Sequence, residues 1–366
     1  MIILKNSEKF TVFKTKDKNY KNVVIKIALK KPDKIFREIK LIKKLMQSSS
    51  FFKKRIPTII EQGYFKKGIY KNKGFYKQNF VPGLTFSEII QNQKIASKDL
   101  SLILKTLIKQ FLLPIRKSNF KKTKKQSAHM NNLIKIEYSK ITTKNLLSNL
   151  EKSKNILING KKYKNMGFYL QKVFKSKILK TLDRERPFLS NLGHWNFHGG
   201  NIIFPSKKNY KNFFIIDPDA TWNLNDPFFS LARFVYTYPH DTMEYNKYSI
   251  YSDTFKKIKK TNTIKFKTNI LWKTNIDKKY KDVFSQFYSK NFMKNILFDN
   301  LNRVEYLRFN LTLILCFIRG VNSNFESKIN FLDKKTSVFQ NKSIYLYLLS
   351  LIMLERFIKH INYLEN

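Results

Sequence analysis

The sequence GHWNFHGGNIIF, residues 193–204, decides how the rest of the chain is interpreted. It places two histidines, two asparagines and three glycines before a short apolar run, although the whole chain of 366 residues contains only 10 glycines. Polar residues and glycines gathered in this way are typical of a loop that carries function. Where such a loop would carry a carboxylate, this one has Asn196. The substitution raises the question of whether the loop still supports chemistry.

The residues after this loop predict a β-hairpin. NIIF (201–204) and NFFII (212–216) are short apolar runs that flank the turn-like PSKKNYK. Antiparallel pairing would bring Asn201, at the start of the first strand, beside Asp217, which follows the second. Amide and carboxylate oxygens are ligands that suit Mg²⁺. The pattern therefore predicts a cation site at Asn201 and Asp217, and the alternative is that both residues only cap turns.

The first 83 residues predict strands with one helix. NVVIKIAL (22–29) alternates between an apolar face and a face of small residues around one lysine, which is typical of a strand. DKIFREIKLIKKLM (33–46) has apolar residues at helical spacing after helix start signals. TIIEQGYF (58–65) and GFYKQNFVPG (74–83) predict two more strands. The predicted order is strand, helix, strand, strand.

From about residue 84 the periodicity is mostly helical. Leucine and isoleucine recur at helical spacing in the segments FSEIIQNQ (86–93), DLSLILKTLIKQFLLPI (99–115), RFNLTLILCFIRG (308–320) and IYLYLLSLIMLERFI (344–358). We therefore predict an N-terminal nucleotide-binding lobe over residues 1–83 and a C-terminal catalytic and substrate-binding lobe over 84–366. The second lobe would contain a helical insert at about 116–190, and the loop with its hairpin at 193–227.

The chain is strongly basic, with a formal net charge of +47 from 72 Lys+Arg and 25 Asp+Glu. Such a charge would suit a polyanion such as nucleic acid or an anionic membrane. The lysines, however, are spread over the whole chain beside abundant Asn, Ile, Phe and Tyr, as AT-rich codons would supply. We therefore attribute most of the charge to a solvated surface and expect no nucleic-acid partner. A polyanion-binding protein is a minor alternative.

The one cysteine, Cys316, excludes an intramolecular disulfide and is expected to be a small buried hydrophobe. The N-terminal residues lack the apolar region of a signal peptide, and no uninterrupted apolar run approaches the ~18 residues of a membrane span. These patterns predict a cytoplasmic protein without a membrane span.

Two further segments follow the loop in a fixed order, Ile215-Ile216-Asp217-Pro218 and Asn225-Asp226-Pro227. Together with the loop at 194–201 they resemble the catalytic core of the aminoglycoside phosphotransferase and choline kinase-like family, in which H-G-D-x-H-x-G-N or a close variant precedes I-D and then G-D-P. The resemblance implies an α+β protein with the two-lobed protein kinase-like fold. A small N-terminal β-sheet lobe with one helix would precede a large, mainly helical C-terminal lobe.

The resemblance also implies a nucleotide site in the first lobe. Lys26 would hold the phosphates of ATP or GTP, and Glu38 on the next helix would be its ion-pair partner. The backbone of Asn79, Phe80 and Val81 would bind the nucleotide base as a hinge.

In the second lobe, the resemblance implies that Asn201 and Asp217 hold Mg²⁺ beside those phosphates. His194 would be a structural histidine of the loop, and Asp226 would cap the next helix and brace the loop.

Two positions and one segment depart from the family pattern. Asn196 replaces the acid that would accept the proton of the substrate hydroxyl, and Trp195 replaces a glycine. The first hairpin, at 5–22, has no glycine to let a loop close over the phosphates. A general base contributes about 10²–10⁴-fold in rate, whereas positioning and charge neutralisation carry most of phosphoryl transfer. Slow turnover with nucleotide binding retained is therefore expected, unless His198 or Asp219 supplies the base.

The resulting hypothesis is a phosphotransferase that moves the γ-phosphoryl group of ATP or GTP to a hydroxyl of a small molecule such as a sugar or amino alcohol. An aminoglycoside is a less favoured acceptor, because the chain lacks the acidic surplus that would attract a polycation. The alternative is a pseudokinase that binds nucleotide or acts as a scaffold.

Overall fold

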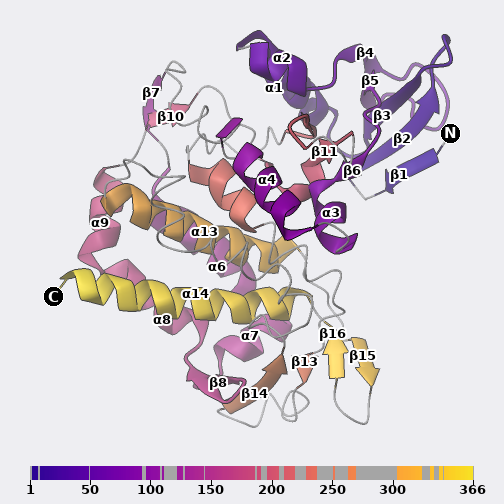
Figure 1. The fold of residues 1–366 in the computed structure, drawn as a ribbon. Helices are drawn as coiled ribbons and strands as arrows, with labels where there is room; N and C mark the ends of the chain where they lie inside the picture. Colours follow the sequence, from indigo (N-terminus) through magenta and orange to yellow (C-terminus); the bar gives the residue numbers. More distant parts are fainter. Residues whose placement is uncertain are drawn as a thin grey trace.

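The chain folds as an α+β protein with an antiparallel sheet at its N-terminal end and a mainly helical remainder (Figure 1). The computed structural model describes residues 2–6, 9–48, 50–92, 96–107, 109–110, 122–126, 128–143, 145–185, 188–190, 196–205, 210–218, 228–236, 250–251, 263–268, 303–323, 330–333, 338–340 and 342–365. This arrangement of a sheet lobe before a helical lobe is the fold class that the sequence predicted.

The N-terminal lobe is built on a five-stranded antiparallel sheet in the order β1-β2-β3-β5-β4. Its strands are β1 (Ile2–Asn6), β2 (Phe10–Lys16), β3 (Asn22–Ala28), β4 (Ile59–Tyr64) and β5 (Gly74–Asn79). The central strand β3 pairs with β2 on one side and β5 on the other. The backbone in the middle of β3 is therefore fixed by hydrogen bonds on both sides, which also fixes where its side chains project.

Helix α1 (Pro32–Ser48) packs on this sheet and begins with a proline, which is favoured at a first helical position. Its apolar residues at helical spacing are buried against the strands, as predicted from Ile35, Ile39, Ile42 and Leu45. The order strand, helix, strand, strand is correct for β3, α1, β4 and β5, and β1 and β2 precede it. A short second helix, α2 (Ser50–Arg55), follows α1, so the expectation of one helix in this lobe is corrected to two.

Arg55, the last residue of α2, joins the two lobes. Its guanidinium donates hydrogen bonds to the carbonyl oxygens of Lys211 (3.1 Å) and Phe213 (3.2 Å), and to the amide oxygen of Gln110 (3.2 Å). It also lies 4.6 Å from the centroid of the Phe213 ring. A guanidinium with several donors in a fixed plane can satisfy such a cluster of acceptors at once.

The chain passes into the C-terminal lobe through Gly83 and the short strand β6 (Leu84–Thr85), which pairs with β11 (Ile202–Phe204). Helix α3 (Phe86–Asn92) starts directly after β6 with a capping box. The Thr85 hydroxyl accepts from the Glu88 backbone N–H (3.1 Å), and the Glu88 carboxylate accepts from the Thr85 backbone N–H (2.7 Å). Helix α4 (Ser97–Leu107) follows.

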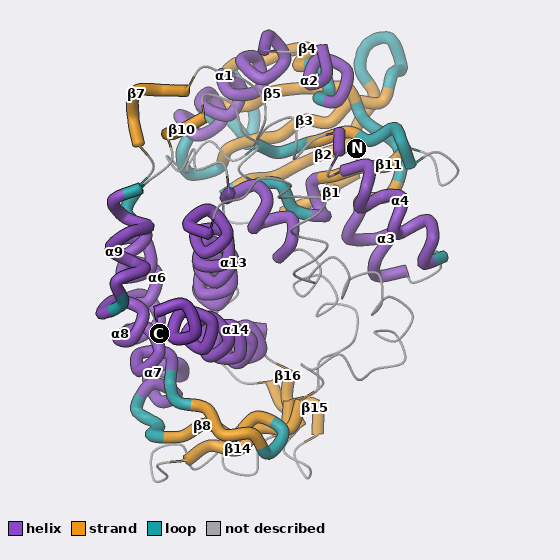
Figure 2. The backbone as a smooth tube through the Cα atoms, turned by 60° about the vertical axis from the view of Figure 1, so that its left-hand side comes forward, coloured by secondary structure: helices purple, strands orange, loops and turns teal. Residues whose placement is uncertain are grey.

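Two long helices, α13 (Arg303–Ser323) and α14 (Lys342–Glu365), pack against each other in the C-terminal lobe (Figures 1 and 2). Every residue from Leu311 to Ile318 is buried, because this part of α13 is surrounded by other helices. Cys316 is fully buried, as predicted, and burial raises the pKa of its thiol to about 12. No helix among the described residues has both the length and the apolar character to cross a bilayer.

The segment predicted as a helical insert, at about 116–190, contains strands as well as helices. It contains the helices α6 (Met130–Thr142), α7 (Asn145–Glu151), α8 (Met166–Lys175) and α9 (Lys177–Arg184). It also contains β7 (Lys122–Gln126), β8 (Asn155–Ile158), β9 (Lys161–Tyr163) and β10 (Phe188–Ser190), with β10 paired to β7.

Strands β8 and β9 belong to a second sheet, at the lower end of Figure 1, in the order β15-β16-β13-β14-β8-β9. Its other strands are β13 (Ile250–Tyr251), β14 (Thr263–Thr268), β15 (Asn330–Asp333) and β16 (Val338–Gln340). Asn159 and Gly160 connect β8 to β9 with φ of 51° and 83°. Asn-Gly is the strongest short-range signal of a hairpin, so the sequence did carry a sign of these strands.

We predict that Gly83→Ala destabilises the protein by about 3 kcal/mol, because Gly83 has a φ of 129° and a Cβ there would lie 2.2 Å from the carbonyl oxygen of Phe204. Urea unfolding measures the change. Gly68→Ala is the matched control, because Gly68 has a φ of 79° but nothing within 4 Å of an added Cβ. The control is expected to cost only about 1 kcal/mol, and equal losses in the two variants would contradict the role given to the Phe204 contact.

Candidate functional site

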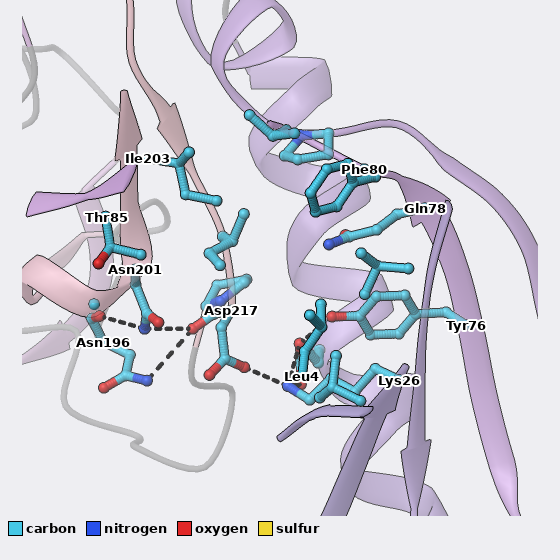
Figure 3. A pocket seen from close by; sticks show the side chains of 18 of the residues that line it. Leu4, Lys26, Tyr76, Gln78, Phe80, Thr85, Asn196, Asn201, Ile203 and Asp217 are labelled. Atoms are coloured by element: carbon cyan, nitrogen blue, oxygen red, sulfur yellow. Dashed lines mark hydrogen bonds and ion pairs between the residues drawn. The ribbon is translucent and has the colours of Figure 1, made fainter. Parts of the chain in front are cut away.

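A cavity of about 620 Å³ lies between the N-terminal sheet and the segments that follow it (Figure 3). Side chains of β1, β2, β3, β5 and α1 form one side. The other side is formed by Asn196, Gly200, Asn201, Ile203 and residues 216–218. The linker from Asn79 to Gly83 and the start of α3 complete it. The cavity is of the size that commonly holds a small-molecule ligand.

Lys26 projects from the central strand β3 and is nearly inaccessible, at 7% exposure. Its ammonium group is 2.8 Å from each carboxylate oxygen of Glu38. Glu38 is 2% exposed, in the middle of α1, where the buried apolar residues of the helix hold it over the sheet. The two residues that the sequence proposed as an ion pair are therefore in direct contact.

Tyr76 is a third member of this group that sequence reasoning missed. It stands opposite Lys26 in the β3–β5 register, and its hydroxyl donates to Glu38 Oε1 at 2.7 Å. Tyr76 and Gln78 lie two residues apart on β5 and both line the cavity, as strand alternation requires. The only signal in the sequence was a tyrosine inside a predicted strand.

The ionisation of these groups follows from their burial and from each other. Burial lowers the pKa of Lys26, but the charges of Asp217 and Glu38 outweigh it and raise that pKa above its ordinary value. Burial raises the pKa of Glu38 to about 7, against the opposing effect of Lys26. Burial, with Glu38 nearby, also raises the pKa of Tyr76. Because Lys26 stays charged in contact with both Glu38 oxygens, the geometry favours an ion pair in which Tyr76 is a donor.

The hairpin predicted after the loop is present as β11 and β12 (Phe214–Ile215), with Ile202 opposite Ile215. The Ile216 N–H extends this pairing by donating to the Asn201 carbonyl oxygen at 3.0 Å. The next residue, Asp217, has a φ of 54°, which is uncommon for a residue other than glycine but tolerated by aspartate. Its carboxylate contacts the Lys26 ammonium, so it lies between the lobes (Figure 3).

The side chain of Asn201 is oriented by the hydrogen bonds that its amide group donates. Its Nδ2 donates to the carbonyl oxygens of Asn196 (2.9 Å) and Asp217 (3.4 Å), which leaves Oδ1 as the atom able to bind a cation. Asn201 and Asp217 both line the cavity, and together they offer an amide oxygen and a carboxylate. This pair fits Mg²⁺, which takes one or two protein oxygens and completes its shell with water and phosphate. The described residues contain no group of three His, Cys, Asp or Glu side chains arranged to hold a metal.

Asn196 lines the cavity beside them, and its side-chain amide is also oriented by neighbours. Arg233, on the helix over residues 228–236, donates to Asn196 Oδ1 at 3.4 Å, and Asn196 Nδ2 makes a long hydrogen bond to the Asp217 carbonyl at 3.5 Å. The amide oxygen therefore faces an arginine. An amide in this position can accept a hydrogen bond, but it cannot take a proton at neutral pH.

The backbone of this loop is fixed by aromatic packing. Phe197 is fully buried, with its ring 5.4 Å from that of Phe234 on the following helix. Phe234 in turn stacks on Phe86 of α3 at 5.9 Å. The loop is thus braced from both adjoining helices, whichever residue occupies position 196.

His198 starts the 3₁₀ turn Gly199–Asn201 and caps it, since its Nδ1 accepts from the Gly200 N–H at 3.2 Å. It is not among the residues that line the cavity. A catalytic role for His198 stays a prediction. The positions proposed as braces, His194 and Asp226, lie outside the described residues, as do Trp195 and Asp219.

The proposed hinge residues Asn79, Phe80 and Val81 all line the cavity. The Asn79 N–H donates to the Thr58 carbonyl and the Phe80 N–H to the Asn22 carbonyl, both at 3.2 Å. For the Val81 N–H there is no acceptor among the described residues. Of the three backbone donors, Val81 is the one available to a ligand.

No protein-family model matches the sequence, and no curated protein matches it. Among solved structures, the chain is similar to a candidate aminoglycoside phosphotransferase from Ralstonia eutropha JMP134, with a TM-score of 0.49 and 11% identity over 98% of this chain and 91% of that one. It is also similar to an aminoglycoside phosphotransferase from Alicyclobacillus acidocaldarius, with a TM-score of 0.45 and 10% identity over 99% of this chain and 91% of that one.

We predict that Tyr76→Phe lowers the free energy of unfolding by about 2 kcal/mol, because a buried hydrogen bond to a charged carboxylate is lost. A double-mutant cycle with Glu38→Gln, measured by urea unfolding, separates this bond from other effects of the substitution. Tyr64→Phe on β4 is the control, since Tyr64 is 52% exposed. A coupling energy near zero between positions 38 and 76 would show that the hydroxyl does not hold Glu38.

Proposed function

We propose that the chain is a kinase-like phosphotransferase that moves the γ-phosphoryl group of ATP or GTP to a hydroxyl of a small molecule. The observation that carries the proposal is the position of Lys26, held between Glu38 of the first lobe and Asp217 of the second, with Asn201 beside them. A cation anchored in this way, next to oxygen ligands for Mg²⁺, is suited to a polyphosphate.

The walls of the cavity suit a flat base as well as phosphates. Leu4, Val12 and Val24 contribute apolar surface from the sheet, and Ile203 and Ile216 contribute it from the hairpin side. A base between these surfaces would lie next to the linker at residues 79–81, where the Val81 N–H can donate to it. The apolar part and the cationic part of the cavity thus match the two halves of a nucleotide.

In the proposed reaction, an oxygen of the acceptor hydroxyl forms a bond to the γ-phosphorus while the bond to the β–γ bridging oxygen breaks. Lys26 would bind the phosphates, with Glu38 and Tyr76 fixing its position. Mg²⁺, held by Asn201 and Asp217, would neutralise the developing charge on the phosphate oxygens. Asn196 would orient the acceptor hydroxyl. Its proton would pass to solvent, because the amide cannot accept it.

A second candidate function is nucleotide binding without turnover. The observation that favours it is the amide of Asn196, whose oxygen is directed to Arg233 and whose nitrogen is directed to a backbone carbonyl. In that arrangement the side chain braces the loop. The nucleotide site formed by Lys26, Glu38 and Asp217 would be retained in either case.

We predict that Mg²⁺ with ATP raises the melting temperature of the wild-type protein by several degrees, because a ligand at 100 times its Kd stabilises the native state by about 2.7 kcal/mol. Differential scanning fluorimetry measures the shift, with each variant compared with its own ligand-free state. Lys26→Met and Asp217→Asn are expected to lose the shift. Lys77→Met on β5, whose ammonium pairs with Glu61 at 3.2 Å, should retain it. A wild-type protein with no shift would contradict both candidate functions.

We predict that Asn196→Asp increases ATP hydrolysis, with water as the acceptor, by about 10²–10⁴-fold, because a carboxylate can serve as general base. Release of ADP measures the rate, and His198→Ala and Asp219→Ala test for a recruited base. If wild-type turnover is no faster than that of Asp217→Asn while nucleotide binding persists, the second function is the correct one. If His198→Ala or Asp219→Ala slows the wild-type reaction as much as Asp217→Asn does, the base is supplied by that residue.

A further inference from the structure

A second lysine lines the phosphate end of the cavity. Lys34 lies in the first turn of α1, four residues before Glu38, so the two side chains share one face of the helix. Lys34 is half-buried, and its side chain is among those that form the cavity wall. The sequence pattern did not distinguish it from the many other lysines of the chain.

The ammonium groups of Lys34 and Lys26 both lie near the aromatic ring of Phe10. The Lys26 ammonium lies 4.7 Å from the centroid of the Phe10 ring, and the Lys34 ammonium lies 4.9 Å from the same centroid. The face of an aromatic ring attracts cations, so Phe10 holds two ammonium groups around one side chain of β2. The two lysines therefore form a pair of positive charges at one end of the cavity.

The two cations differ in what already neutralises them. Lys26 contacts the carboxylates of Glu38 and Asp217. Within the part of the chain that the structure describes, no carboxylate forms an ion pair with Lys34. Among the described residues, Lys34 therefore adds a positive charge at this end of the cavity that no ion pair neutralises.

The sequence of the connection between β1 and β2 suggests a role for Lys34 in binding phosphate. In protein kinases a glycine-rich loop covers the nucleotide phosphates. Here the sequence between the two strands is Ser7-Glu8-Lys9, without a glycine. A connection without glycine has less backbone freedom to fold closely around a ligand. A phosphate chain in this cavity would have fewer backbone donors, and a side-chain cation is a direct substitute for them.

We propose that Lys34 is a second phosphate-binding cation of the cavity, which takes the place of a glycine-rich loop and makes the site selective for nucleoside polyphosphates. The proposal rests on the proposed nucleotide site and specifies the part of the ligand that the site recognises most strongly. Lys26 positions the phosphates relative to Asp217. Lys34 adds the charge that makes the site bind a nucleoside di- or triphosphate more tightly than a nucleoside without phosphates.

The test compares ATP, ADP and adenosine, each with Mg²⁺, by isothermal titration calorimetry on the full chain. Lys34→Gln is expected to weaken ATP and ADP binding by about 10-fold, the usual effect of one charge-assisted hydrogen bond. Adenosine binding should be unchanged, which also shows that the variant is folded. Lys34→Arg should retain most of the affinity for ATP. The wild-type affinity for ATP should also fall more steeply with salt than that of Lys34→Gln.

Lys40→Gln is the matched control, because Lys40 is an exposed lysine of the same helix and does not line the cavity. The inference is overturned if Lys34→Gln binds ATP as tightly as the wild type, or if Lys40→Gln weakens ATP binding equally, which would indicate only the general basic field of the protein. A wild-type protein that binds none of the three ligands would instead contradict the proposed nucleotide site itself.

Discussion

The arrangement of the two lobes depends on one buried ammonium group. Lys26 is almost inaccessible, and a buried charge is tolerated only where partners compensate it. Glu38 provides that compensation from α1 and Asp217 provides it from the end of the hairpin, so three separate elements must be in register for the charge to be stable. Removing Lys26 would leave the carboxylates of Glu38 and Asp217 without their cation, which is far more costly than the net value of an ion pair. The site and the fold are therefore stabilised by the same contact.

Short-range patterns predicted the elements of this site and the pairing of Asn201 with Asp217, whereas the pairing of Lys26 with Glu38 was implied by the family resemblance. Alternation in β3 and the helical spacing of α1 indicated the elements that carry Lys26 and Glu38. The antiparallel hairpin implied that Asn201 and Asp217 are adjacent, because register is a local property of strands. The contacts of Tyr76, Lys34 and Arg233 could not be predicted, since each joins elements that are distant in the sequence. Their partners are decided by how the helices pack on the sheet. The hairpin at Asn159-Gly160 was missed for a different reason, because helical periodicity on both sides concealed a valid turn signal.

The conformation of the loop at residues 196–201 does not depend on the residue that would act as its general base. Its shape is maintained by the burial of Phe197 and by the amide of Asn201, which bonds to the backbone at Asn196 and Asp217. None of these contacts needs a carboxylate at position 196. The loop can therefore keep its conformation when the acid is absent, and a nucleotide site can persist independently of the chemistry next to it. The two proposed functions, phosphoryl transfer and nucleotide binding without turnover, are therefore compatible with the same backbone.

The contacts of Arg55 constrain any movement of one lobe relative to the other. The lobes are joined covalently through the linker at Gly83 and non-covalently through the guanidinium at the end of α2, which is bonded to the carbonyl oxygens of Lys211 and Phe213. A rotation about the line between these two connections would leave both intact, whereas a sliding of one lobe over the other would break the hydrogen bonds of Arg55. Such a rotation would separate Lys26 from Asp217, so the free energy of breaking this ion pair would contribute to the cost of moving the lobes apart.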